Sequence, residues 1–243
     1  MAATRLPSTG NDEFPDGGEP GCNTDDLRIV HSLLRELYTE GPQLVRAVPD
    51  GNLERTRFVA DHVADISNGL HLHHVGEDKV LWRRLETRAP SCAVHVAQMR
   101  EQHAAVADLL ERLNEQLPRW RASGSAEDAE RVADALDDVR TALLPHLGLE
   151  EEKIAPVAAT ALSQQEWNQM AEHGMAALPK NRLLLQLGAI LNSFPPEERE
   201  RWFKESVPTP ARMLYRLLGR RQYDRYQEEL HRDVAGGGTS RSD

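Results

Sequence analysis

The sequence predicts an all-α protein, an up-down-up-down four-helix bundle followed by a C-terminal helical extension. Ala, Leu, Glu, Arg and Gln dominate the 243 residues, and no stretch alternates Val, Ile, Thr and aromatic residues with a period of two. Apolar residues instead recur at helical spacing in four long segments. Short connections join these segments, as expected for antiparallel neighbours in a bundle.

Each of the four segments has an apolar stripe and is bounded by residues that begin or end helices. The first starts near Thr24, a suitable N-cap residue, and Gly41–Pro42 ends or bends it. The other three are expected over residues 53–86, 91–120 and 126–161. Within the last of them, Pro145 and Pro156 each predict a kink or a local break.

Composition divides the chain into four regions. Residues 1–23 are rich in Pro, Gly, Asp and Ser and are expected to form a flexible N-terminal arm. Residues 24–162 form the predicted bundle, and residues 163–235 the helical extension, which could cap the bundle, form a second lobe or make a homodimer contact. Residues 236–243 are expected to be a flexible tail. The helices of the extension are expected over residues 164–173, 177–194, 197–205 and 209–232.

Charge and composition argue against several classes of partner. The chain has 29 basic and 39 acidic residues and a net charge of −10, so we expect neither a nucleic-acid nor a membrane partner. No apolar run approaches the ~18 residues of a membrane-spanning helix, and the N-terminus does not resemble a secretory signal. With only two cysteines as well, we expect a cytoplasmic protein. A run of basic residues is expected to be a solvated helix face or a contact for the acidic bundle: Arg212, Arg216, Arg220, Arg221 and Arg225.

Two of the expected bundle helices carry the same short motif, a histidine followed four residues later by a glutamate. The pairs are His73 with Glu77, and His146 with Glu150. Four residues rise about 6 Å along an α-helix and complete nearly one turn, so both members of each pair project from one face. An imidazole and a carboxylate that converge in this way are suitable ligands for iron, zinc or manganese.

One helix upstream of each pair lies a further histidine, His31 in the first helix and His103 in the third. The set therefore reads H…HxxxE…H…HxxxE, a helical hairpin repeated at an offset of 72 or 73 residues. Leu81 and Ile154 also correspond, each following its motif histidine by eight residues. Such a repeat predicts a two-metal site at the centre of the bundle. The expected metal ligands are His31, His73, Glu77, His103, His146 and Glu150.

This ordered set, with the stretches LHLHHVGEDKVLW and LLPHLGLEEEKIAP, resembles the hemerythrin-like family, also called the HHE cation-binding domain. The resemblance covers about residues 24–162. It implies a non-haem di-iron centre, bridged by an oxo or hydroxo group and two carboxylates, and it assigns the six residues above as ligands. Zinc also suits six nitrogen and oxygen ligands. Iron is favoured over zinc by the resemblance, not by the spacing.

The chain departs from the oxygen-carrying members of that family at one position. Those proteins have a second histidine one turn after the third-helix ligand, where this chain has Ala107. The iron on that side is therefore expected to have fewer histidines and an open position or a ligand from elsewhere. His74 points about 100° away from His73 on a helix, so the two do not suit one metal. The pair His74–Asp78 is an alternative register for the motif.

Histidines outside the set are interpreted separately. His71 and His74 are expected at the surface in preference to a supporting role at the site, and His62 and His231 at the surface. His173 follows the bundle, and folding back over the site is the less favoured expectation for it.

The expected function is binding or reduction of dioxygen, hydrogen peroxide or nitric oxide, with a small molecule as the partner. Open coordination positions on the metal favour redox chemistry over reversible oxygen binding, so an activity that consumes peroxide or nitric oxide is one expectation. The alternative is an iron or redox sensor, or an iron store, that signals through the C-terminal helices. A ferritin-like carboxylate oxidase needs Glu-x-x-His pairs on core helices, and Glu228–His231 near the C-terminus is the one such pair.

Overall fold

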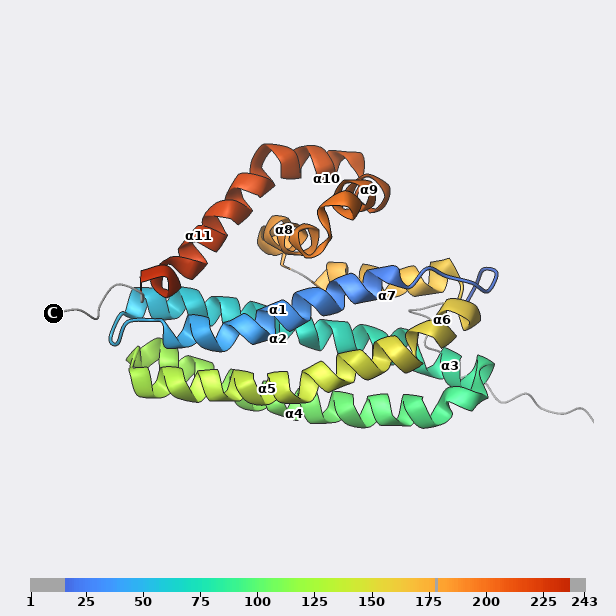
Figure 1. The fold of residues 1–243 in the computed structure, drawn as a ribbon, viewed down its shortest axis with the longest axis horizontal. Coiled ribbons are helices and arrows are strands. Elements are labelled where there is room, and N and C mark those ends of the chain that lie inside the picture. The colour runs from blue at the N-terminus through green and yellow to red at the C-terminus, as the bar shows by residue number, and fades with distance from the viewer. Residues whose placement is uncertain (1–15, 178, 237–243) are drawn as a thin grey trace, which may run out of the picture.

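A computed structural model describes residues 16–177 and 179–236. Four long helices run antiparallel in the up-down-up-down arrangement that the sequence predicts (Figure 1). They are α1 (Asp25–Arg46), α2 (Leu53–Val80), α4 (Ala93–Ser123) and α5 (Ala126–Lys153). Each packs against its neighbours in the sequence, and α5 closes the bundle against α1. No strand occurs in the described part of the chain, which confirms the all-α class.

The helix ends are set by local hydrogen bonds and by one glycine. The Asn52 side chain accepts a bond from the Arg55 amide at the start of α2, and Ser125 caps α5 in the same way. Thr24 occupies the expected N-cap position of α1 but makes no capping bond with its side chain. Gly124 ends α4 with a φ of 61°, and a Cβ there would lie 2.9 Å from Leu53 Cδ2, so this turn requires glycine.

The two helices that carry the HxxxE motif both break at equivalent positions. Leu81 separates α2 from α3 (Trp82–Arg88), and Ile154 separates α5 from α6 (Ala155–Ala161). The sequence predicts one continuous helix over 53–86, and this prediction is wrong because the helix is interrupted at Leu81. In the fourth segment the break occurs two residues before Pro156, whereas α5 continues through Pro145. A short 3₁₀ turn (Pro90–Cys92) leads into α4.

The bundle interior is built from two clusters of buried apolar side chains. The larger cluster fills the half nearest the α1–α2 connection and includes Tyr38, Trp120 and Leu136. The smaller one lies around α3 and α6 and includes Trp82 and Trp167. Buried histidines and glutamates lie on the same helices as these clusters, so the polar groups are held by a close-packed apolar frame.

Residues 16–23 form part of the structure, although the sequence predicted a flexible arm over 1–23. The amides of Gly21 and Cys22 donate to the carbonyls of Leu162 and Ala159, at the end of α6. Residues 1–15 of the expected arm, and 237–243 of the expected tail, lie outside the described residues.

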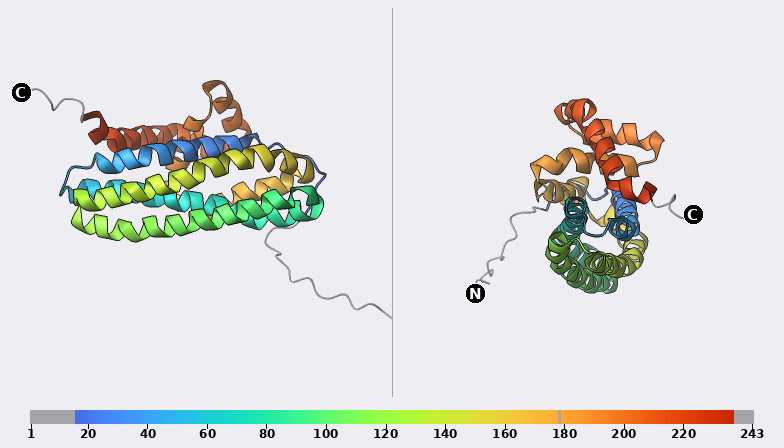
Figure 2. Two further views of the ribbon diagram at one scale, coloured as in Figure 1. Left: turned by 60° about the horizontal axis from the view of Figure 1, so that its bottom comes forward. Right: turned by 90° about the vertical axis from the view of Figure 1, so that its left-hand side faces the viewer.

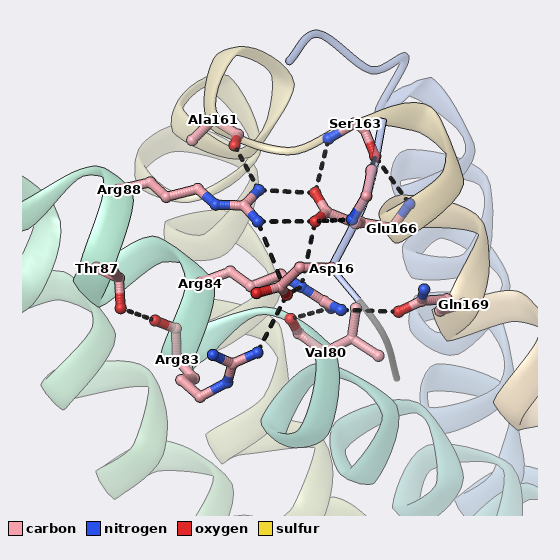
Figure 3. A network of polar contacts seen from close by, with 11 residues as sticks. Asp16, Val80, Arg83, Arg84, Thr87, Arg88, Ala161, Ser163, Glu166 and Gln169 are labelled. Atoms are coloured by element: carbon pink, nitrogen blue, oxygen red, sulfur yellow. Dashed lines mark hydrogen bonds and ion pairs between the residues drawn. The ribbon is translucent and has the colours of Figure 1, made fainter. Parts of the chain in front are cut away.

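A buried carboxylate, Glu166 of α7 (Gln164–Ala177), holds this N-terminal segment to the bundle (Figure 3). It receives two bonds of 2.7 Å from the Arg88 guanidinium and one of 3.0 Å from each of the Gly17 and Ser163 amides. Arg84 donates to Asp16 at 2.7 Å in the same network. The network thereby joins α3, α7 and the N-terminal segment.

Acid is expected to weaken the fold through Glu166. The Arg88 guanidinium and the two amides hold the pKa of Glu166 at about 2, below its ordinary value of 4.5. Because the folded pKa is depressed, the stabilisation is present above about pH 4.5 and is lost as the pH falls toward about 2. In this window we expect the free energy of unfolding to fall more steeply for the wild type than for Glu166→Gln.

Chemical denaturation at several pH values through this window measures the difference. Glu172→Gln, an exposed position on the same helix, is the matched control and should keep the wild-type slope. Equal slopes for the wild type and Glu166→Gln would contradict this role of the carboxylate.

The C-terminal helices, residues 180–236, lie on the α1–α2 side of the bundle and form what we call the arch (Figures 1 and 2). A 3₁₀ turn (Lys180–Arg182) leads into α8 (Leu183–Ser193), which is followed by α9 (Pro196–Ser206) and α10 (Thr209–Leu214). A π-helical turn (Tyr215–Gly219) then connects α10 to α11 (Arg220–Gly236). The expected helix over 209–232 is therefore nearly continuous, but it contains a π turn.

The base of α11 is fixed to α1 and α2. Arg55 donates 2.6 Å to the Leu230 carbonyl and forms an ion pair with Asp233, and His231 pairs with Glu40. His62 Nδ1 lies 2.9 Å from the hydroxyl of Tyr226. Among the described residues, no helix is both long and apolar enough to cross a bilayer.

Candidate metal centre

Seven buried or nearly buried side chains from the four bundle helices meet in the interior. Helix α1 contributes one histidine, α2 two adjacent histidines and a glutamate, α4 one histidine, and α5 a histidine and a glutamate. In chain order they are His31, His73, His74, Glu77, His103, His146 and Glu150. The i, i+4 spacing places each glutamate one turn beyond its histidine on the same helix face, as predicted.

These side chains form two groups of donor atoms, each group having its atoms within 4.8 Å of one another. One group consists of His74, His103 and His146. The other consists of His31, His73, Glu77 and Glu150. Adjacent residues of α2 therefore supply different groups, because they project about 100° apart around the helix.

Each glutamate lies between the two groups. The carboxylate oxygens of Glu77 are 3.1 Å from His73 Nε2 and 3.5 Å from His103 Nε2. Glu150 Oε2 is 3.4 Å from His31 Nε2 and 3.8 Å from His146 Nε2. Each carboxylate thus faces one imidazole of each group, and this placement suits carboxylates that join two cations.

Several of these buried polar atoms have no hydrogen-bond partner among the described residues. They are both carboxylate oxygens of Glu77, both of Glu150, and the Nε2 atoms of His74, His103 and His146. A buried polar group without a partner costs roughly 1–3 kcal/mol, and more when it is charged. Convergent nitrogen and oxygen donors without other partners are what a bound divalent or trivalent cation would satisfy, so this donor set fits a metal.

The outward-facing nitrogen of three of the imidazoles is held by a second polar side chain. His31 Nδ1 lies 2.9 Å from Glu151 Oε1, and His103 Nδ1 lies 2.8 Å from Asp78 Oδ1. His146 Nδ1 lies 3.1 Å from Gln102 Oε1. An acceptor at Nδ1 favours the tautomer that carries its proton there and leaves the lone pair of Nε2 directed inward.

Burial shifts the pKa values of the histidines and glutamates at this site. It lowers the pKa of His73 to about 3 and that of His146 to about 4, and it lowers the pKa of His74 as well. These imidazoles are therefore neutral near pH 7, the form that binds metals. Burial and the neighbouring Glu150 raise the pKa of Glu77. Despite its burial, Glu150 has its pKa lowered to about 2 by its contact with His31.

All six residues that the sequence singled out lie at this site. His74 does too, so the expectation of a surface position for it is wrong: it is 5 % exposed and stacks on His103 with ring centroids 4.1 Å apart. His74 also places an imidazole on the third-helix side, where the sequence predicted fewer histidines and an open position or a ligand from elsewhere, so His74 is a candidate for that ligand. The adjacent pair His73-His74 could have indicated this position, because neighbouring residues of one helix can serve two different metals.

The remaining predicted positions separate into supporting and distant ones. Asp78 and Glu151 contact site histidines and belong to neither group. His173 lies beside Gly76 and is in neither group, whereas His71 is exposed. His62 was expected at the surface but is 6 % exposed, because Tyr226 of α11 covers it. Its neighbour on α11, His231, is half-buried against Glu40.

Comparison with known proteins gives one family. A model described as the hemerythrin HHE cation binding domain matches residues 22–158, more than half of the chain and all seven of the residues described above. No curated protein and no solved structure matches the chain.

Proposed function

The chain belongs to the hemerythrin HHE cation-binding family, and on that premise we propose that its two donor groups hold two iron ions and act on dioxygen, hydrogen peroxide or nitric oxide. The observation that carries the proposal is the position of Glu77 and Glu150, each facing one histidine of either group. Two carboxylates and five imidazoles are a donor set suited to iron in both common oxidation states. Iron bound there would supply electron transfer and a position for a small ligand.

The surrounding protein restricts what can reach the site. Six of the seven side chains are at most 5 % exposed, and His73, with 14 % of its side chain exposed, is the most accessible. A buried site of this kind admits diatomic molecules or peroxide in preference to larger substrates. His73 is therefore the member of the set closest to solvent.

The residues that hold the imidazoles also define the polarity of the site. Glu151 contacts His31 and accepts a bond of 2.8 Å from Arg35, and Asp78 contacts His103 and accepts from the Trp82 indole at 2.5 Å. Each carboxylate is thus fixed by a second donor and holds its histidine in one orientation. Carboxylates placed in this way increase the basicity of the ligand histidine and stabilise a higher charge on the metal.

Anaerobic reconstitution with ferrous iron tests the proposal. We expect about two irons per chain by metal analysis, and a near-ultraviolet absorption after oxidation. Separate additions of dioxygen, peroxide and nitric oxide then show which one changes the spectrum and is consumed. Binding of fewer than one iron, preferential retention of zinc, or iron that none of the three reagents affects would contradict the proposal. A fully reversible oxygen spectrum without turnover would limit the function to oxygen binding.

Asp78 offers a test of the supporting carboxylates. Asp78→Asn preserves the shape of the side chain and removes the charge beside His103, so we expect iron affinity to fall about 10–100-fold. Competition with a chromophoric chelator measures the affinity. Asp108→Asn, at an exposed position on α4, is the control and should retain the wild-type affinity. An unchanged affinity in Asp78→Asn would show that its contact with His103 does not support the site.

A further inference from the structure

The arch carries a row of large apolar side chains that no described part of the chain covers. Met213, Leu214, Leu217 and Leu218 are 61 %, 47 %, 69 % and 59 % exposed. They lie at i, i+1, i+4 and i+5 and therefore share one side of the segment formed by α10 and the π turn. Tyr215 and Gly219, on the other side, are buried toward α8.

Basic side chains continue the same surface along the helix. From Arg212 to Arg225 the chain has five arginines and one acidic residue, Asp224. Arg216 is paired with Glu200 of α9, and Arg220 lies 4.0 Å from Asp224. Arg221 and Arg225 form no ion pair with any residue that the structure describes. We call the surface formed by Met213, Leu214, Leu217, Leu218, Arg221 and Arg225 the arch face.

We propose that the arch face docks onto the surface of an anionic lipid bilayer. A helical segment with aliphatic side chains on one side and arginines beside them is typical of helices that lie in the membrane interface. Helix α10 lies on the part of the molecule farthest from α4 and α5 (Figure 1), so this end of the arch can reach a flat surface before the bundle does.

Charge favours an anionic bilayer over a second copy of the chain as the partner of the arch face. The arch face has two arginines and no acidic side chain, so a second copy of it offers no opposite charge to them, whereas an anionic bilayer does. The whole-chain charge of −10 predicted no membrane partner, but a surface responds to charges within a Debye length of about 10 Å. The segment that carries the arch face, residues 212–225, has five arginines and one acidic residue.

Vesicle sedimentation with the full chain tests the proposal. We expect the protein to sediment with vesicles of phosphatidylcholine that contain about 30 % phosphatidylglycerol, and much less with phosphatidylcholine alone. Raising the salt concentration should weaken the binding. Leu217→Ser with Leu218→Ser should lower the partition coefficient at least ten-fold. Arg221→Gln with Arg225→Gln should lower it about twenty-five-fold, near five-fold for each arginine.

Val94→Ser is the matched control, because Val94 is 76 % exposed on α4, away from the arch. It should bind vesicles like the wild type. A second measurement uses Leu218→Trp, whose fluorescence should be quenched by brominated anionic lipid more than that of the wild type. Circular dichroism confirms that each variant is folded.

The remaining outcomes would overturn the proposal. These are no binding to anionic vesicles, equal binding by the wild type and both double variants, or no extra quenching in Leu218→Trp. A dimer in light scattering that Leu217→Ser with Leu218→Ser dissociates, without vesicle binding, would make the face a contact between copies. Binding to polyglutamate but not to vesicles would indicate an acidic protein partner instead.

Discussion

Glu150→Ala is expected to weaken cation binding by more than 100-fold, whereas Glu152→Ala should leave it unchanged. Glu150 is fully buried and faces His31 and His146, one from each donor group, so its loss removes an oxygen ligand from both proposed cations. Glu152 lies two residues away on α5 with 67 % of its side chain exposed. Metal analysis after reconstitution, together with a chelator titration, measures the difference. Retention of two irons in Glu150→Ala would rule out a joining role for this carboxylate.

A substitution at the other buried glutamate, Glu77, separates loss of metal binding from loss of folding. Glu77 and Glu150 are both buried and each lies between the two donor groups, and in the metal-free protein burial and the neighbouring Glu150 disfavour the ionisation of Glu77. Glu77→Gln should therefore leave the free energy of unfolding of the metal-free protein unchanged or higher, while iron binding is lost. Denaturant titration of the chelator-treated protein measures this, and a marked destabilisation would contradict it.

His74→Ala is the second substitution with a large expected effect, and it separates a site of seven ligands from one of six. His74 supplies one of three imidazoles in its group, so we expect the affinity for one of the two irons to fall by more than about 100-fold. The other iron should remain bound, because His31, His73 and Glu150 are untouched. The reconstituted variant should therefore contain about one iron per chain.

His71→Ala is the matched control, since His71 lies three residues earlier on α2 and is exposed. It should bind two irons. If His74→Ala also retained two irons with unchanged affinity, His74 would be a packing residue and the six residues taken from the sequence would suffice.

The bundle could be predicted because its signals are local. A stripe of apolar residues at helical spacing reports which side of a helix is buried, and repeated motifs report that two hairpins are alike. The six-residue set followed from that repetition alone. Even the correspondence of Leu81 with Ile154 proved structural, because both residues are the positions where their helices break.

What could not be predicted depends on contacts between distant parts of the chain. His62 is buried by Tyr226, which is 164 residues away in the sequence. The 100° between His73 and His74 on a helix excludes both from one metal, but it does not reveal that the bundle interior holds two donor groups, one for each histidine. The ordering of residues 16–23 depends in the same way on Glu166, whose partners no periodicity reveals.

Helix α1 has a role in both halves of the molecule. His31, near its start, belongs to the buried donor set, and Glu40, nine residues and about 13 Å further along, holds the base of α11 through His231. A shift of α1 that accompanies a change in metal ligation would therefore also move the contacts that hold α11. By thermodynamic linkage, a surface that binds the arch and a cation that binds the donor groups would then change each other's affinity by the same factor.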